Sequence, residues 1–164
     1  MEFKDLPGVK KGNLGEQIVD EWLDKQGLIV YEPSTDNAHG FDRLVSVDKS
    51  SLVIVEVKTK PKRLYYPDTG INIKHFEGYK KVSQKHNIPL CIFFVDEILK
   101  QIYCGWLSEL VQEKQIKWKG KRITYPLTNK GIVYFYQPGM KVIHHLTDDE
   151  AEQIKLLSNR SYNY

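Results

Sequence analysis

Four charged residues in the first 60 positions have types and spacing that suit chemistry on a phosphate: Glu16, Asp42, Glu56 and Lys58. Glu56 and Lys58 are two residues apart in an apolar, β-branched segment, so on a strand both would project from one face. Burying either charge alone is costly, which indicates that this end of the strand opens into a cleft. The bland alternative for a Glu-x-Lys pair is an ion pair at a strand end.

Carboxylates from Asp42 and Glu56 would form an open, oxygen-rich site, and such sites suit Mg²⁺ or Mn²⁺. Lys58 could orient or deprotonate a water, or offset charge that grows on a phosphorane-like transition state. Zinc is not favoured, because the chain has no Cys-x-x-Cys or Cys/His ligand spacing. Cys91 and Cys104 stand in apolar runs and are predicted to be buried, reduced thiols.

The first element that must position these groups is a helix. Met1 to Lys11 is interpreted as a loosely held arm, and Asn13 is expected to cap a helix that ends near Gln26, before Gly27. Glu16 would lie at the border of its buried face, where a solvated glutamate is the alternative. The apolar arc of this helix is formed by Leu14, Ile18, Val19, Trp22 and Leu23.

Three strands are expected next, at Leu28–Glu32, Phe41–Val47 and Ser50–Lys60, with a polar loop at Ser34–Gly40. The turn from Asp48 to Ser51 is short, so the second and third strands should form an antiparallel hairpin that sets Asp42 across from the Glu56 end. The third strand should carry Leu52, Ile54, Glu56 and Lys58 on one face and Val53, Val55 and Val57 on the other.

A loop from Lys60 to Gly70 then leads to a helix from about Asn72 to Asn87. The apolar run Pro89–Val95 predicts an interior strand, reached by a right-handed crossover from the central strand. The later elements are expected to be a strand at Gln101–Trp106, a brief helix at Leu107–Gln115, a strand at Ile132–Tyr136 and a helix from the capping box Thr147–Glu150 to about Leu157.

Basic residues flank the candidate site in two groups. One is the loop with Lys60, Lys62 and Arg63, and the other is the helix face with Lys74, Lys81 and Lys85. Either group could hold phosphates, and a solvated surface is the alternative. In a further basic stretch, Lys114–Arg122, Trp118 could stack on a base or anchor a surface loop to the core.

The composition is that of a globular domain, with 164 residues, 41% hydrophobic and 27% charged. We expect a single domain, with a core at about 12–110 and an extension at 111–164 that packs on it. A net charge of +3 permits nucleic-acid binding without requiring it. The beginning of the chain has no apolar run like that of a signal peptide and no later run is long enough to span a membrane, so the expected location is the cytoplasm.

Taken in order, helix-borne Glu16, then Asp42, then Glu56-Val57-Lys58, then a helix with Tyr79, the chain resembles the PD-(D/E)xK nuclease superfamily. This superfamily includes archaeal-type Holliday junction resolvases and many restriction enzymes. The resemblance covers roughly Gly12 to Leu110. It implies an α/β restriction-endonuclease-like fold, a mixed sheet flanked by helices with αβββαβ order.

The resemblance also implies roles. Asp42, Glu56 and the main-chain carbonyl of Val57 would bind Mg²⁺, Glu16 would support the metal site, and Lys58 would assist the attacking water. Tyr79 would belong to the catalytic group, although His75 stands where some members have a glutamine. Phe41 stands where the family often has proline, a position that does no chemistry.

The expected function is therefore a metal-dependent nuclease that hydrolyses phosphodiester bonds in DNA, of the endonuclease or junction-resolving type. A noncatalytic nucleic-acid-binding or scaffolding module on the same fold is the alternative from another class, and an RNA nuclease would leave the same motif. Members of the superfamily often form homodimers to cut two strands, but the sequence shows no heptad or interface stripe.

Overall fold

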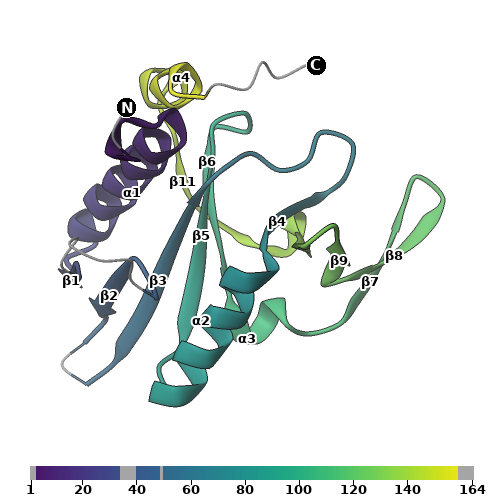
Figure 1. Cartoon of the computed structure of the whole chain (residues 1–164), viewed down its shortest axis with the longest axis horizontal. Helices are drawn as coiled ribbons and strands as arrows, with labels where there is room; N and C mark the ends of the chain where they lie inside the picture. Colours follow the sequence, from purple (N-terminus) through teal and green to yellow (C-terminus); the bar gives the residue numbers. More distant parts are fainter. Residues whose placement is uncertain (1–2, 34–39, 49, 159–164) are drawn as a thin grey trace.

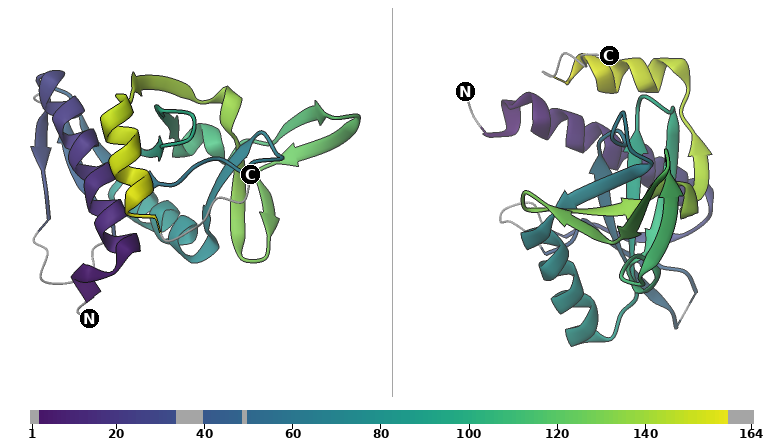
Figure 2. Two further views of the ribbon diagram at one scale, coloured as in Figure 1. Left: turned by 90° about the horizontal axis from the view of Figure 1, so that it is seen from above. Right: turned by 90° about the vertical axis from the view of Figure 1, so that its right-hand side faces the viewer.

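The structure is a computed structural model, and it describes residues 3–33, 40–48 and 50–158. A six-stranded mixed sheet forms the centre, with strand order β1-β2-β3-β5-β6-β11. Helices α1 and α4 cover one face, while α2 and a small second sheet cover the other (Figures 1 and 2). This is the α/β architecture of a mixed sheet flanked by helices that the sequence predicted.

The central sheet is built from β1 (Ile29–Tyr31), β2 (Arg43–Ser46), β3 (Leu52–Thr59), β5 (Leu90–Asp96), β6 (Gln101–Trp106) and β11 (Lys141–His145). Strands β3 and β5 are parallel, and the other neighbours are antiparallel. The predicted antiparallel hairpin is therefore confirmed, as is a crossover between the parallel strands β3 and β5. The expected loop at Ser34–Gly40 lies mostly outside the described residues.

The two faces of β3 belong to two separate cores. Val53, Val55 and Val57 pack with α1 (Pro7–Lys25) and α4 (Asp148–Leu156). Ile54 packs on the opposite side, in the core that contains Phe76 of α2. The alternation predicted from the sequence is thus observed, and the charged end of the strand lies on the α2 side.

The start of α1 differs from the prediction. The helix begins at Pro7 rather than after Asn13, and a 3₁₀ turn precedes it at Phe3–Asp5. Proline suits the first helical turn because its fixed φ is helical and that position needs no hydrogen-bonded N–H. The buried Lys11 ammonium pairs with Glu97 at the end of β5, which ties the segment to the body. The interpretation of residues 7–11 as a loose arm was therefore wrong.

The capping residues of two helices are those that the sequence predicted. In α2 (Ile73–His86) the Asn72 side chain accepts a hydrogen bond from the Lys74 main-chain N–H, and Asn87 closes the helix in the left-handed conformation at φ 52°. Helix α4 begins with a capping box between Thr147 and Glu150. The brief helix α3 spans only Leu107–Leu110.

The expected loop at Lys60–Gly70 was partly wrong, because its end forms β4 (Asp68–Asn72). β4 pairs with β10 (Ile132–Tyr136), which also pairs with β9 (Leu127–Asn129), to give the second sheet. Pro67 and Gly70 disfavour a strand locally, but pairing with a distant segment overrides that preference. The basic stretch after α3 forms a separate hairpin, β7 (Lys114–Trp118) and β8 (Lys121–Tyr125).

No helix in the described ranges has both the length and the apolar character required to cross a membrane. Both cysteines are free, with Cys91 buried and Cys104 half-buried.

Candidate active site

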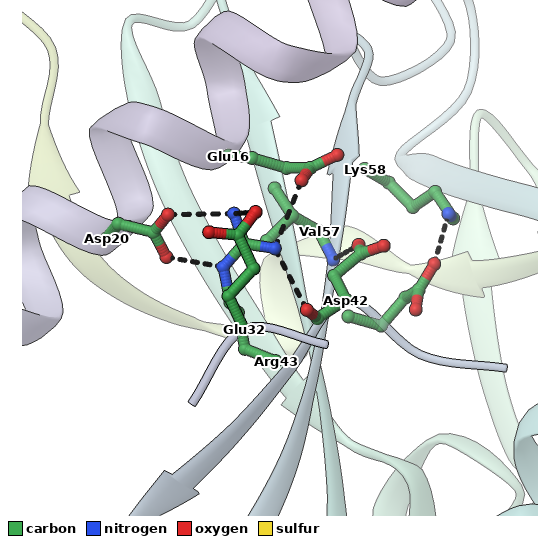
Figure 3. A network of polar contacts seen from close by, with 8 residues as sticks. Glu16, Asp20, Glu32, Asp42, Arg43, Val57 and Lys58 are labelled. Carbon is green, nitrogen blue, oxygen red and sulfur yellow. Dashed lines mark hydrogen bonds and ion pairs between the residues drawn. The ribbon is translucent and has the colours of Figure 1, made fainter. Parts of the chain in front are cut away.

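Asp42 lies immediately before β2, at the end of the β2–β3 hairpin that is opposite its turn. Arg43 pairs with Val55 in the register, so the preceding Asp42 lies opposite Glu56. The Asp42 carboxylate accepts a hydrogen bond of 2.7 Å from the main-chain N–H of Val57. This contact fixes the carboxylate between the two residues of the Glu-x-Lys motif (Figure 3). The expected position across from Glu56 is therefore observed.

Glu56 is buried, with 3% of its surface exposed, and its Oε1 accepts hydrogen bonds from both Lys58 Nζ and the Tyr79 hydroxyl. The Lys58 ammonium also lies 5.6 Å from the centre of the Tyr79 ring. Strand β3 supplies two of these groups and α2 the third. The His75 ring, on the preceding turn of the helix, lies 6.3 Å from that of Tyr79.

The buried guanidinium of Arg43 organises the acidic side of the site. It forms two hydrogen bonds of 2.8 Å to Asp20, and an ion pair of 3.2 Å to Glu16. It also donates to the main-chain oxygen of Asp42 at 2.9 Å, and lies 3.6 Å from Glu32. Figure 3 shows how this one side chain connects helix α1 to Glu32 and to the start of β2. Glu16 is held beside the hairpin by this contact.

Burial and mutual repulsion act on the carboxylates. Burial raises the pKa of Glu56, and the charge of Asp42 raises it further, whereas Lys58 and Tyr79 act in the opposite direction. Burial and Asp42 also raise the pKa of Glu16, against the lowering effect of Arg43. Burial and the nearby Glu56 charge raise the pKa of the Tyr79 hydroxyl, so Tyr79 is a hydrogen-bond donor at neutral pH.

A close approach of α1 to β3 allows Glu16 to reach this region. A Cβ placed on Gly15 would lie 1.8 Å from Thr59 Oγ1 and 2.9 Å from Thr59 Cβ. Any larger residue would push the helix away from the strand. Glycine at this position therefore sets the distance between the glutamate and the hairpin.

The donor chemistry of Asp42 and Glu56 fits a hard divalent cation. Both are carboxylates: Asp42 immediately precedes β2, and Glu56 lies on the paired strand β3. Asp42 destabilises the charge of Glu56, an effect that a bound cation would reverse. Within residues 3–33, 40–48 and 50–158, no group of three Asp, Glu, His or Cys side chains is arranged to hold a metal. Mg²⁺ commonly uses only one or two carboxylates and keeps several waters, so two carboxylates suffice for that ion.

The predicted basic residues have different surroundings. Lys74, Lys81 and Lys85 are exposed on α2. In the loop after β3, Lys60 Nζ donates to the main-chain oxygen of Gly70, and Lys62 Nζ donates to that of Arg63 at 3.3 Å. These two lysines are half-buried and stabilise the loop conformation.

Arg63 is engaged within the protein. Its guanidinium makes two hydrogen bonds of 2.6 Å to the fully buried Asp68. It also lies over two aromatic rings, 4.1 Å from that of Tyr66 and 3.8 Å from that of Tyr134. Tyr125 donates a third hydrogen bond to Asp68 at 2.7 Å. This cluster attaches the loop to the second sheet.

Sequence reasoning missed Arg43, Asp20 and Gly15. Two signals were present: Arg43 directly follows the candidate aspartate, and Asp20 lies four residues after Glu16, on the same helix face. A basic residue beside several acids is too common in sequences to identify a buried hub.

Comparison with known proteins supports the fold. The chain is similar to the 1.6 Å structure of Hjc, a Holliday junction resolvase from the archaeal hyperthermophile Archaeoglobus fulgidus. The TM-score is 0.55 at 11% sequence identity, over 85% of this chain and 99% of that one. No family model matches the sequence, and no curated protein matches it. The restriction-endonuclease-like fold predicted from the sequence is thereby confirmed.

Proposed function

We propose that the chain is a Mg²⁺- or Mn²⁺-dependent nuclease that hydrolyses phosphodiester bonds in DNA, as an endonuclease or a junction-resolving enzyme. The observation that carries this proposal is the cluster of Asp42, Glu56 and Lys58 on paired strands of a restriction-endonuclease-like fold. The likeness to a Holliday junction resolvase supports a branched substrate. We further propose one domain, a core at 12–110 with 111–164 packed on it. A cytoplasmic location and a homodimer stay predictions.

In this proposal Asp42, Glu56 and the main-chain carbonyl of Val57 hold the cation, with Glu16 beside them. The cation would polarise the phosphate and make a water more acidic. Tyr79 keeps Glu56 oriented through its hydrogen bond. The Lys58 side chain is 24% exposed, so its ammonium can donate to the attacking water or to a phosphate oxygen at the surface of the site.

The exposed lysines of α2, Lys74, Lys81 and Lys85, are proposed to contact the DNA backbone. They lie on the exposed face of the helix whose buried face carries Tyr79, the residue that donates a hydrogen bond to Glu56. Lys60, Lys62 and Arg63 belong to the same proposed DNA interface, where their internal hydrogen bonds hold the loop in shape. Changing all three α2 lysines to alanine should weaken binding to all sequences and flatten its salt dependence.

The decisive experiment is single-turnover cleavage of labelled plasmid, single-stranded and branched DNA, with Mg²⁺, Mn²⁺ or EDTA. Lys58→Ala should reduce the rate about a hundredfold or more, as the loss of one positioned transition-state donor does. Glu56→Gln should also abolish cutting, through lost metal affinity. Lys25→Ala and Glu21→Gln, at exposed positions of α1, are the matched controls. Full activity of a folded Lys58→Ala protein would refute the mechanism. If wild-type protein cuts nothing with any divalent metal, the noncatalytic binding module replaces the nuclease.

A further inference from the structure

The β7–β8 hairpin, residues 114–125, carries the entire basic excess of the chain. It contains Lys114, Lys117, Lys119, Lys121 and Arg122, and no acidic residue. The whole chain has a net charge of +3, so the rest of the molecule sums to −2. The positive charge is therefore concentrated in one short element.

The hairpin projects away from the body of the protein (Figures 1 and 2). Its two strands are joined by a tight turn in which Lys119 and Gly120 both have positive φ, 45° and 80°. Positive φ at both central residues is the type I′ geometry that continues the twist of a two-stranded ribbon. The element is thus a regular, twisted β-ribbon with a narrow tip.

The two faces of this ribbon differ. One carries Ile116, Trp118 and Ile123, all half-buried. The other places Lys117 directly opposite Arg122, and both are exposed. Like charges at paired positions destabilise a β-ladder, and neither side chain forms an ion pair with another described residue. This pair does not stabilise the ribbon, and an anionic partner would offset its repulsion.

The ribbon is attached to the loop that leaves the candidate active site. The Trp118 indole N–H donates to the main-chain oxygen of Tyr65 at 3.3 Å. Tyr65 lies in the segment that connects the end of β3 to β4, seven residues after Lys58. This hydrogen bond relates the position of the ribbon to the strand that carries the proposed catalytic lysine. One substrate molecule could therefore contact both the candidate active site and the exposed face of the ribbon.

We propose that the β7–β8 hairpin is a DNA-binding arm that enters a groove of double-stranded DNA beside the cleavage site, with Lys117 and Arg122 against phosphates. This inference rests on the proposed function. The major groove of B-form DNA is wide enough for a two-stranded β-ribbon. Double-stranded RNA has a deep, narrow major groove that does not admit one. Lysine and arginine contacts to phosphates release counterions, which gives binding a measurable salt dependence.

The test uses the full chain and a fluorescein-labelled 30-base-pair DNA duplex in EDTA, so that no cleavage occurs. Fluorescence anisotropy at several salt concentrations gives the binding constant and its slope against log salt. Lys117→Ala combined with Arg122→Ala should weaken binding about tenfold or more and reduce the slope by about 1.8, close to 0.9 for each lost phosphate contact. Lys25→Ala with Lys155→Ala, on α1 and α4, removes the same charge and should leave both values unchanged.

Two results would overturn the arm. One is a folded arm variant whose affinity and slope match those of the control variant. The other is an equal loss of binding to an RNA duplex of the same sequence, which would exclude groove entry. Failure of the nuclease proposal gives a different result. If the wild-type protein cuts no DNA but the double variant shows the expected slope change, the nuclease proposal fails and the DNA-binding arm is retained. If the wild-type protein cuts DNA but the double variant has an unchanged slope, only the proposal of a DNA-binding arm is refuted.

Discussion

Replacing Arg43 by methionine should destabilise the protein and identify the guanidinium as the organiser of the acidic cluster. The substitution keeps much of the aliphatic volume and removes a charge that is 5% exposed and bonded to Asp20, Glu16 and a main-chain oxygen. Removing one partner of a buried ion pair costs about 3 to 5 kcal/mol. The side chains of Asp20 and Glu16 are 32% and 27% exposed, so water can solvate part of the charge left unpaired. We therefore expect the free energy of unfolding to fall by about 3 kcal/mol.

The loss should depend on pH. Arg43 lowers the pKa of Glu16, which burial and Asp42 raise, so methionine at this position raises it further. A group with a folded-state pKa above its unfolded value stabilises the fold at low pH and loses that contribution as pH rises. The deficit in unfolding free energy should therefore grow as the pH rises through the raised folded-state pKa of Glu16, which lies above the ordinary glutamate value. It should be larger at pH 7 than at pH 4.5.

Urea denaturation at both pH values measures this, with the free energy of unfolding extrapolated to water. Arg122→Met is the matched control, since it removes an exposed arginine and should change stability by no more than about 0.5 kcal/mol. A loss below about 1 kcal/mol for Arg43→Met, or a larger loss at pH 4.5 than at pH 7, would refute the role given to the guanidinium.

Gly15→Ala should lower the free energy of unfolding by about 1 to 3 kcal/mol, because the added Cβ overpacks against β3. Gly12→Ala on the same helix has nothing within 4 Å of an added Cβ and should raise it by up to about 1 kcal/mol. Thermal and urea unfolding compare the two variants, and equal effects would exclude the close approach of α1 to β3. Tyr79→Phe removes a hydrogen bond that lowers the pKa of Glu56, so the acidic limb of the cleavage pH profile should move to higher pH and the rate below it should fall about tenfold; an unmoved profile would make the tyrosine structural only. Asp42→Asn and Glu56→Gln should each weaken Mn²⁺ binding in isothermal titration by about tenfold or more, and wild-type affinity in both would show that neither is a ligand.

The central strand was predictable because its signal is local. Val53, Val55 and Val57 face one core and Ile54 faces the other, and the short turn before β3 fixes the pairing that brings Asp42 opposite Glu56. The limits of α2 were readable for the same reason, because Asn72 and Asn87 end the helix with their own conformations. Such features depend on neighbours within a few positions.

The predictions that were wrong or missing concern segments whose structure depends on residues far away in the sequence. The beginning of α1 is held by Glu97, 86 residues away from Lys11, so Asn13 looked like a better cap than it is. Strand β4 exists because β10 pairs with it, and nothing near Gly70 announces that partner. The hub formed by Arg43 joins three segments of the chain, and the charge pattern of any one of them is ordinary.

Strands that follow Leu110 pair with earlier strands in both sheets, and this has a consequence for shortened versions of the protein. β10 is a hydrogen-bonding partner of β4, and β11 covers the outer side of β6. A chain that stopped at Leu110 would leave the main-chain N–H and C=O groups of both strands open. Open edges invite pairing with other copies, so the shortened protein should aggregate rather than fold as an independent core. The last third of the sequence thus protects the sheet that carries the candidate site.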